Sequence, residues 1–520
     1  MTSPIRTWRA ILFAILIGSA LILAVRAIAG PFRLGISVTS PMNAEGVFGL
    51  AVFLLFLAGA RPAFHRAGAR GPRPWHVAAL LIAAGFAAFA PSLHSPFLAD
   101  DYDHIPHALH TTPASIAALF TQPAADRFFR PAAFVAYAAE ARLAGFSRVA
   151  WHSLSIALHI AVSFLVYAFA RRRQSRPWTA LAAALLFLLH ASRPEAVTWI
   201  AAQFDLWAAF FFLIALLAFA QRWYAASLAP LLLALLSKES AYVYPLVLLL
   251  LLRIDRVPPR LWPRLAGPSF LLTGAVFLYR WHLLGGIGGY RNLGTDRPYI
   301  LTFDFLRTTK ALTARLAAVL DFPVNWSHPL EWWLIAALLG AMAAWIALAA
   351  TKVDRRQLWF GLGFLFLAAL PVHEFLLIDA NLEKSRVLYL PSVGYALIFA
   401  AALEAARPRL AILAASAILT FNIAALEHNL AVWSSVSQLA WRTCESVAAL
   451  NRPLALSDIA NTVDGVYFLH TGLRGCIESA AGKPLAHLYL ATDPAPAQPP
   501  PIALDWDDQA RRFVRRNELP

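Results

Sequence analysis

Long apolar runs alternate with short polar stretches along residues 8–427. A bilayer crossing by a helix needs about 20 apolar residues, so each run is a candidate membrane span. About thirteen runs stand out by this criterion, and they lie near 8–29, 44–60, 75–91, 149–170, 178–190, 204–220, 225–236, 241–252, 265–284, 331–350, 357–371, 392–406 and 408–427. The runs at 178–190, 225–236 and 241–252 are short, which predicts tilted, broken or partly re-entrant segments. The pattern predicts an all-α polytopic membrane protein.

Composition supports this interpretation. The 520 residues are 59% hydrophobic and only 14% charged, whereas soluble globular proteins carry about 25% charged residues. That much apolar surface does not fit inside one water-soluble core. The first apolar run has no convincing small-residue cleavage site, so we interpret it as a span and not as a removed signal peptide.

The basic residues predict the orientation of the chain. The formal net charge is +15, and much of it sits in three clusters between apolar runs: Arg61, Arg66, Arg70, Arg73; Arg171, Arg172, Arg173, Arg176; Arg253, Arg256, Arg260, Arg264. Loops rich in Lys and Arg face the cytoplasm, which also places the N-terminus, residues 352–356 and residues 407–409 there. No basic stripe is interleaved with stacking aromatics, which argues against a nucleic-acid partner.

The same threading places the remaining segments on the outer face: 92–148, 190–204, 237–240, 285–330 and 372–391. It divides the chain into a membrane domain, 1–427, and a small tail domain, 428–520, that ends in the periplasm. Richness in Ala, Arg and Pro suggests a bacterial inner membrane. The only two cysteines, Cys444 and Cys476, fall in the tail, and an oxidising compartment would allow them to form a disulfide.

Aromatic and amphipathic patterns mark the membrane interface. Residues 303–320 read FDFLRTTKALTARLAAVL, where Phe305, Leu312, Leu316 and Val319 could share one face of a basic helix lying in the interface. Tryptophans near the ends of runs are most simply an interfacial belt: Trp151, Trp199, Trp281, Trp332 and Trp333.

The sharpest cluster of polar residues is FLADDYDHI at 97–105, directly after the third apolar run. Adjacent carboxylates repel, so one pKa in the pair Asp100–Asp101 should rise. A carboxylate there could act as a general base or bind a metal; the alternative is a helix cap with solvated loop acids. Asp103 and His104 have loose metal-ligand spacing, and no dedicated metal site is predicted, although a divalent cation remains an open alternative.

Four segments carry a resemblance to a known family. They are FLADDYDHI, FLLHASRPEAVTWIAAQFDLWAAFFFLIAL at 187–216, LLSKESAYVYP at 235–245 and EKSRVLYLPSVGY at 383–395. In this order they resemble the GT-C superfamily of integral-membrane glycosyltransferases, and most of all the transmembrane and tetratricopeptide-repeat O-mannosyltransferases and their bacterial relatives. The tetratricopeptide repeats of that group do not occur in residues 428–520.

The resemblance implies a GT-C fold and a polyprenyl-phosphate-sugar donor. It implies transfer of a hexose or pentose, with inversion, to an acceptor hydroxyl on a glycan, lipid or protein. An outer-loop aspartate would be the base, with Asp100 the first choice and Asp101 the second. Alternatives are a transferase acting on lipid A or surface polysaccharide, and, in a different class, a transporter or flippase of lipid-linked glycans among membrane lipids.

A lipid-phosphate leaving group needs cations near the membrane surface, because an unpaired buried anion is costly. Lys238 and Arg386 lie at predicted outer span ends, and Arg130 follows the aspartates. Each of the three has an alternative interpretation. Lys238 could form a structural ion pair with Glu239, Arg386 could extend to lipid headgroups, and Arg130 could make only a surface contact. Further candidates are expected to position the acceptor or the aspartates, or else to form a structural network: His190, Glu195, Asp205 and Glu239.

Overall fold

The structure is a computed structural model. It describes residues 4–34, 36–38, 40–61, 71–122, 128–174, 176–289, 304–450, 452–485, 488–491, 493 and 502–515. Two features named from the sequence lie outside these ranges: the pair Arg66 and Arg70, and residues 290–303 of the outer segment 285–330.

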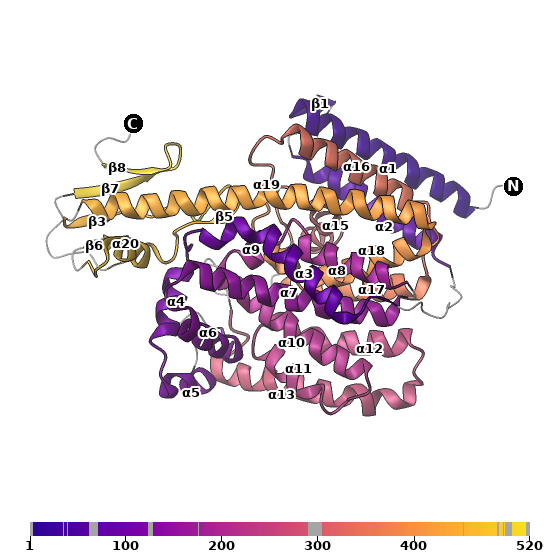
Figure 1. Ribbon diagram of the computed structural model, residues 1–520, viewed down its shortest axis with the longest axis horizontal. Coiled ribbons are helices and arrows are strands. Elements are labelled where there is room, and N and C mark those ends of the chain that lie inside the picture. The colour runs from indigo at the N-terminus through magenta and orange to yellow at the C-terminus, as the bar shows by residue number, and fades with distance from the viewer. Residues whose placement is uncertain are drawn as a thin grey trace.

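The chain is 72% helical, and eight helices within the described ranges are long and apolar enough to cross a membrane. This makes it a multi-pass membrane protein (Figure 1). The eight are α1 (Pro4–Ala29), α2 (Met42–Gly59), α3 (Pro74–Phe89), α7 (Arg148–Arg173), α10 (Gln203–Ala220), α16 (Trp332–Ala349), α17 (Arg355–Ala369) and α19 (Pro408–Ala449).

The predicted count of about thirteen spans is not confirmed. Every expected run contains a helix, but five of these helices fall outside the eight. They are α8 (Pro177–Leu189), α11 (Leu228–Leu235), α12 (Tyr244–Ile254), α13 (Trp262–Leu284) and α18 (Pro391–Ala405). The helix α11 has eight residues, so at 1.5 Å per residue it is roughly 12 Å long, well short of a bilayer core. The three runs predicted to be short correspond to α8, α11 and α12, of 13, 8 and 11 residues, and none of them is among the eight.

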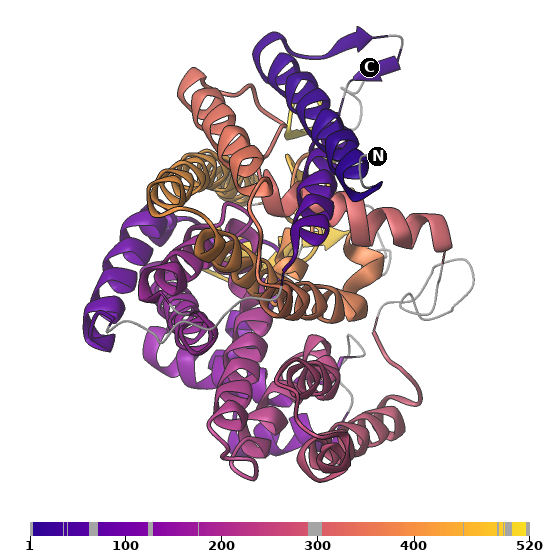
Figure 2. The same cartoon turned by 90° about the vertical axis from the view of Figure 1, so that its right-hand side faces the viewer.

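Neighbouring helices pack closely, with α7 against α8 and α10, α16 against α19, and α17 against α18 (Figure 2). Glycines allow α17 and α18 to approach closely, because a Cβ on Gly394 of α18 would lie 2.5 Å from the carbonyl oxygen of Gly361 on α17. In lipid, helices associate through this kind of close packing, because the hydrophobic effect does not favour helix–helix over helix–lipid contact.

The basic loops gather at one end of the bundle, called here the arginine end. Arg61 donates its backbone N–H to Val353, Arg172 donates to the carbonyl of Ala220, and the carbonyl of Arg173 accepts from Gln357. These contacts join four loops that are far apart in sequence. The ion pair of Arg173 with Asp255, 3.4 Å apart, adds the loop at 253–264. The described parts of the three arginine-rich loops therefore share one end of the molecule, as the sequence predicts for loops on one side of a membrane.

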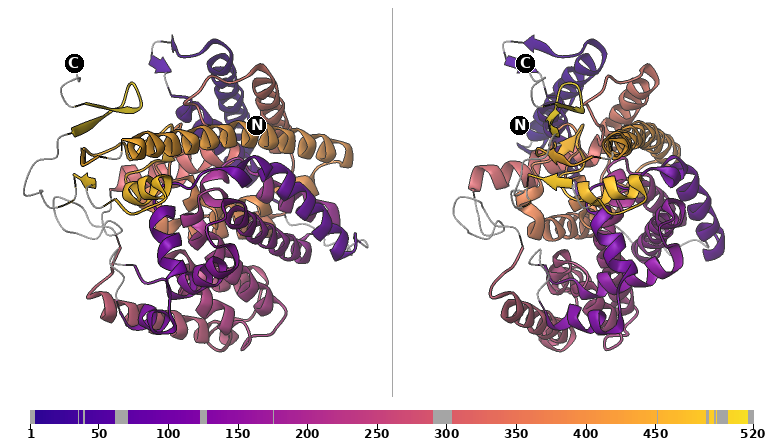
Figure 3. Two further views of the ribbon diagram at one scale, coloured as in Figure 1. Left: turned by 60° about the vertical axis from the view of Figure 1, so that its left-hand side comes forward. Right: turned by 90° about the vertical axis from the view of Figure 1, so that its left-hand side faces the viewer.

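The C-terminal tail packs at the opposite end, called here the tail end. Helix α19 runs for 42 residues without a break, so the predicted boundary at residue 427 falls inside a helix. Beyond it lie a four-stranded sheet and a short helix (Figure 3). The order is β6 (Leu488–Leu490), β3 (Leu454–Leu456), β7 (Ile502–Asp507), β8 (Arg512–Arg515), with a hairpin of β4 (Thr462–Val463) and β5 (Val466–Tyr467) and the helix α20 (Leu473–Ala481).

A second hydrophobic core, separate from that of the bundle, holds the tail end together. It combines the tail with parts of α19 and of segments 97–151 and 199–204. Cys444 on α19 and Cys476 on α20 form a disulfide with a Cα–Cα distance of 5.9 Å, as expected from the sequence. Segment 92–148 contributes three helices: α4 (Asp101–Leu109), α5 (Pro113–Thr121) and α6 (Pro131–Ala144).

Two expectations about the interface need correction. Residues 305–321 are helical, as α14 (Phe305–Lys310), η6 (Ala311–Arg315) and α15 (Leu316–Asp321). Phe305 is 70% exposed, but Leu316 and Val319 are buried against α2, so only the first part could lie in an interface. Trp151 and Trp199 are also buried, because they pack in the tail-end core rather than in a belt.

Candidate functional site

Asp101 is a buried residue that ties the aspartate loop, residues 97–105, to the rest of the site. Its carboxylate accepts backbone N–H groups from Ala201 at 2.7 Å and from Leu98 at 3.1 Å, one on each oxygen. Burial raises the pKa of Asp101 to about 8; the two N–H groups lower it, and the charge of Asp100 raises it. One pKa of the pair is therefore raised, as expected, but burial contributes more than repulsion.

Asp100 differs from its neighbour because it is partly exposed. It stands at the N-terminus of α4, yet its side chain makes no capping hydrogen bond. Its Oδ1 instead accepts the hydroxyl of Thr471 from the C-terminal tail. The capping alternative is therefore wrong for Asp100. Of the two carboxylates, only Asp100 combines a polar partner with access to another molecule.

Arg130 and Arg280 share one carboxylate. Arg130 donates to Oε2 of Glu239 at 2.8 Å, and Arg280 lies 3.3 Å from the other oxygen. Glu239 begins η3 (Glu239–Val243), while Arg280 lies on α13. Burial alone would raise the pKa of Glu239, but the two guanidinium groups lower it to about 2. Glu239 is therefore paired with Arg130 and Arg280, and the proposed Lys238–Glu239 ion pair is absent from the ion pairs of the described residues.

Lys238 pairs with Asp205 instead, with 2.5 Å between its Nζ and Oδ2. Arg386, at the start of η8 (Ser385–Leu388), lies 2.5 Å from Oε1 of Glu195. Burial lowers the pKa of Lys238, Asp205 raises it, and the charges of Arg130 and Arg386 lower it further. The three cations named from the sequence are therefore close enough to influence one another.

These seven side chains form the charged cluster: Arg130, Lys238, Arg280, Arg386, Asp205, Glu195 and Glu239. Among the described residues, it has four cations and three carboxylates. The side chains of Arg130, Lys238 and Arg386 are 15%, 13% and 18% exposed. The cluster is thus mostly buried, but each of these cations can still be reached.

One short segment, residues 199–205, connects the charged cluster to the aspartate loop. Ala201 donates to Asp101, and Asp205 accepts from Lys238. The ring centroid of Trp199 lies 4.7 Å from the guanidinium carbon of Arg386. The ring centroid of Phe204 lies 5.4 Å from the guanidinium carbon of Arg130. A single segment therefore contacts Asp101 and all three predicted phosphate-binding cations.

The tail adds a residue to this region that sequence reasoning missed. Tyr467 on β5 stacks on Trp199, with 4.7 Å between the ring centroids, and Arg386 lies 5.0 Å from the Tyr467 ring. Arg280 was also missed, although an ionisable residue inside an apolar run is a signal that could have identified it. No pattern in the sequence points to Tyr467 or Thr471.

The candidates His190 and His104 make contacts within the protein core. His190 is buried, and its ring nitrogens contact Ser192 and the carbonyl of Leu320 at 2.9 Å each. His104 packs edge-on against the rings of Phe134 and Phe204, 5.8 Å from each. Among the described residues, no group of three or more His, Cys, Asp or Glu side chains could hold a metal ion.

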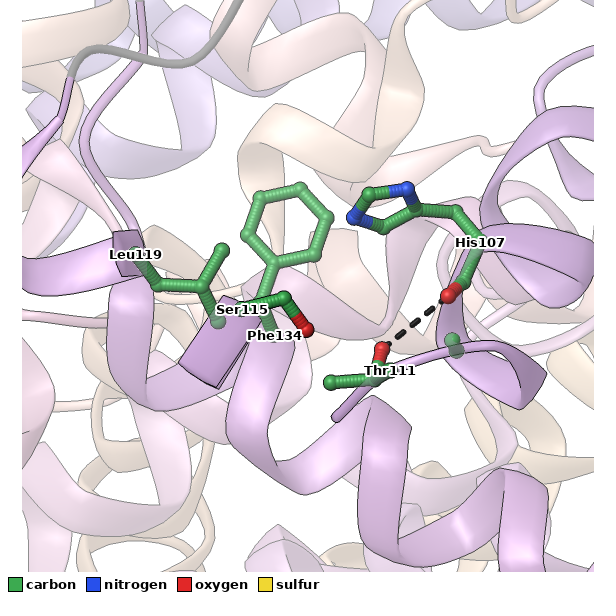
Figure 4. A pocket seen from close by; sticks show the side chains of 6 residues that line it. His107, Thr111, Ser115, Leu119 and Phe134 are labelled. Atoms are coloured by element: carbon green, nitrogen blue, oxygen red, sulfur yellow. Dashed lines mark hydrogen bonds between the residues drawn. The ribbon is translucent and has the colours of Figure 1, made fainter. Parts of the chain in front are cut away.

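A small pocket lies between α4, α5 and α6. His107, Thr111, Ser115, Leu119 and Phe134 point into it (Figure 4). Thr111 donates its hydroxyl to the carbonyl of His107 at 3.0 Å. The cavity measures about 10 Å³, which is room for no more than about one water molecule. It cannot hold a sugar as it stands.

Comparison with known proteins gives no match: no protein-family model, curated protein or solved structure is similar to this chain at a significant level.

Proposed function

We propose that this protein is an inverting glycosyltransferase that uses a polyprenyl-phosphate-linked sugar. The observation that carries the proposal is the 199–205 segment, which joins the aspartate loop to the charged cluster at one end of an apolar bundle. The four motifs that resemble the GT-C superfamily contribute most of the residues in this arrangement.

Asp100 would act as the general base. Its Oδ1 is bound by Thr471, which leaves Oδ2 for the acceptor hydroxyl. The acceptor oxygen forms the new bond to the anomeric carbon as Asp100 takes its proton. The bond from that carbon to the phosphate oxygen breaks, and polyprenyl phosphate leaves with the electron pair. A positioned base of this kind is typically worth about 10²–10⁴-fold in rate.

The charged cluster would hold the donor phosphate. Arg130 and Arg386 can each present a two-pronged donor to phosphate oxygens. The prenyl chain would remain in the bilayer beside the apolar helices. This requires the phosphate site to lie near the membrane surface, at the end of the bundle and not at its middle.

The orientation follows from the positive-inside rule applied to the arginine end. We place that end in the cytoplasm and the tail end in the periplasm of a bacterial inner membrane. The acceptor would be a hydroxyl of a protein, of lipid A or of a surface polysaccharide.

The test uses binding and turnover together. Purified protein should bind a synthetic polyprenyl phosphate, and membrane vesicles should release polyprenyl phosphate from a panel of polyprenyl-phosphate hexoses and pentoses. Mass spectrometry of surface glycans, lipids and proteins with and without the gene would identify the acceptor. If no sugar donor is consumed and no surface glycan changes, the proposal is wrong.

One observation favours the transporter alternative. Glu45 on α2 and Asp321 on α15 are buried in the membrane part, and each has one carboxylate oxygen without a hydrogen-bond partner among the described residues. Buried acids inside a membrane domain often mark ion or substrate pathways. A lipid-linked glycan that crosses proteoliposome membranes without losing its sugar would support a transporter in place of a transferase.

A further inference from the structure

The C-terminal tail contacts the aspartate loop directly, although the two are far apart in the sequence. The hydroxyl of Thr471 donates to Oδ1 of Asp100, a contact between residues separated by 371 positions. The N–H of Ala99, just before Asp100, donates to the carbonyl of Phe468 at 3.0 Å. The tail is therefore joined to the aspartate loop at two points, the backbone of Ala99 and the side chain of Asp100.

The fit between the two segments depends on a glycine. Gly472 has a φ of +71°, and a Cβ there would lie 2.2 Å from the carbonyl oxygen of Ala99. No side chain fits in that space. Ala99 itself has a φ of +42°, an uncommon conformation for a residue other than glycine. Such a conformation persists where the surroundings determine it, and the tail supplies part of those surroundings.

The tail element that carries Thr471 is itself firmly anchored. Cys476 lies on the first turn of α20, and its disulfide with Cys444 ties this turn to α19. The N–H of Cys476 also donates to the carbonyl of Gly472 at 2.9 Å. Thr471 is thus held near Asp100 through the last long helix of the bundle.

We propose that Thr471 is a positioning residue that sets the orientation of Asp100 for catalysis. This rests on the proposed function, in which Asp100 is the base. Without this hydrogen bond, the partly exposed carboxylate of Asp100 would be able to rotate. The hydrogen bond from Thr471 fixes Oδ1 and directs Oδ2 toward the acceptor, and the β-branched side chain of threonine restricts its own rotation. The tail is therefore part of the catalytic centre and not an appended domain.

The experiment separates the hydroxyl of Thr471 from its methyl group. Thr471→Val keeps the shape and removes the hydroxyl, while Thr471→Ser keeps the hydroxyl and removes the methyl. With membrane vesicles and a polyprenyl-phosphate sugar that the wild type accepts, Thr471→Val should lower kcat roughly 10- to 100-fold. KM for the donor should change less than about two-fold, and Thr471→Ser should stay within about three-fold of wild-type kcat.

Thr462→Val is the matched control. Thr462 is another tail threonine whose hydroxyl donates to a carboxylate, Oε2 of Glu383, at 3.3 Å. It should leave kcat unchanged. If Thr471→Val does not fold, Thr471→Ala and Thr471→Ser give the same comparison, because both lack the methyl group and only serine has the hydroxyl.

The outcomes are distinct. Normal turnover in Thr471→Val together with an inactive Asp100→Asn would overturn the positioning role and leave the proposed function standing. Loss of activity in Thr471→Ser with normal activity in Thr471→Val would show that only packing matters, which also overturns it. Normal turnover in Asp100→Asn would show that Asp100 is not the base and would overturn the positioning role with it. A wild-type protein that consumes no sugar donor would overturn the proposed function itself.

Discussion

Lys238 places its ammonium nitrogen 2.5 Å from Oδ2 of Asp205, across 33 residues of chain. Both side chains are mostly buried, with exposed fractions of 13% and 8%. The cation expected to bind a phosphate therefore already has a counter-ion. Arg386 and Arg130 also have carboxylate partners. A donor phosphate would therefore join an existing network of ion pairs.

This pairing predicts two separable effects of removing Lys238. Lys238→Ala should leave Asp205 buried without a partner and destabilise the fold by about 3–5 kcal/mol. The double variant Lys238→Gln/Asp205→Asn removes both charges and should recover most of that loss. Neither variant should bind polyprenyl phosphate as tightly as the wild type. Thermal unfolding measures the first effect, and titration with polyprenyl phosphate measures the second; wild-type affinity in the double variant would make Lys238 purely structural.

Arg386 should be poorly replaced by lysine. Its guanidinium carbon lies 4.7 Å from the ring centroid of Trp199 and 5.0 Å from that of Tyr467, and a lysine lacks both the planar stacking and the two-pronged donor. Arg386→Ala should weaken polyprenyl phosphate binding strongly, and Arg386→Lys should restore only part of it.

The control for Arg386 is Arg511→Lys. Arg511, like Arg386, pairs with a carboxylate. It bonds both oxygens of Asp464 at 2.9 Å each, but Asp464 is not in the charged cluster. Its replacement should leave binding unchanged. Full recovery of affinity in Arg386→Lys would argue that charge alone suffices at that position.

Glu239 should make stability depend on pH in the acid range. Its pKa is lowered to about 2 from an ordinary value of 4.5, so the folded protein holds the ionised form more tightly than the unfolded chain does. The stability it contributes, about 3 kcal/mol at most, is present above pH 4.5 and is lost as the pH falls toward 2. The difference in Tm between wild type and Glu239→Gln should therefore shrink over that range.

A surface glutamate provides the comparison for Glu239. Glu478 lies 4.0 Å from Arg474, and both side chains are substantially exposed, so Glu478→Gln should change Tm little at any pH. A Tm difference for Glu239→Gln that stays constant down to pH 2 would mean that Glu239 is not held ionised by Arg130 and Arg280.

The orientation can be tested without first removing cysteines. The two cysteines of the chain are joined in a disulfide, so a new thiol is the one that reacts in unreduced protein. Ala114→Cys near the start of α5, at the tail end, and Ala225→Cys between α10 and α11, at the arginine end, are both at exposed positions. An impermeant maleimide should label position 114 in intact spheroplasts and position 225 only after permeabilisation. The reverse pattern would refute the proposed topology.

The sequence predicts the parts of this molecule but not how they meet. Apolar runs identify every long helix, because hydrophobicity is local information. The number of crossings does not follow, since helices such as α11 depend on their neighbours for burial. Six members of the charged cluster are candidates from the sequence alone, and five of these lie in the four motifs. The sequence does not show which of them pair with each other, because Arg130 and Glu239 lie 109 residues apart and Arg386 and Glu195 lie 191 residues apart.

The tail shows the limit most clearly. Thr471 and Tyr467 reach the site only because α19 continues past the bundle and the chain folds back through a disulfide-linked helix. Nothing in the periodicity of residues 428–520 indicates which side chains face the membrane domain. Contacts of this kind follow from tertiary packing, and a single sequence does not contain a local signal for them.

The aspartate pair supplies the most decisive prediction, because the structure gives its two members different partners. Asp100→Asn retains an oxygen that can accept from Thr471, so stability should be unchanged, while the amide cannot take a proton from the acceptor and turnover should fall to background. Asp101→Asn should instead destabilise the fold by about 1–3 kcal/mol, since its amide group would face one of the two backbone N–H donors, of Leu98 or Ala201, and leave it unpaired.

Measuring Tm and glycosyl transfer for both variants separates chemistry from stability. A stable, inactive Asp100→Asn beside a less stable Asp101→Asn supports Asp100 as the base and Asp101 as the residue that fixes the loop. The opposite pattern, with a stable but inactive Asp101→Asn and an active Asp100→Asn, would transfer the role of base to Asp101. Near-normal transfer by both would exclude carboxylate catalysis at this loop, and the buried acids Glu45 and Asp321 would then become the centre of a transporter hypothesis.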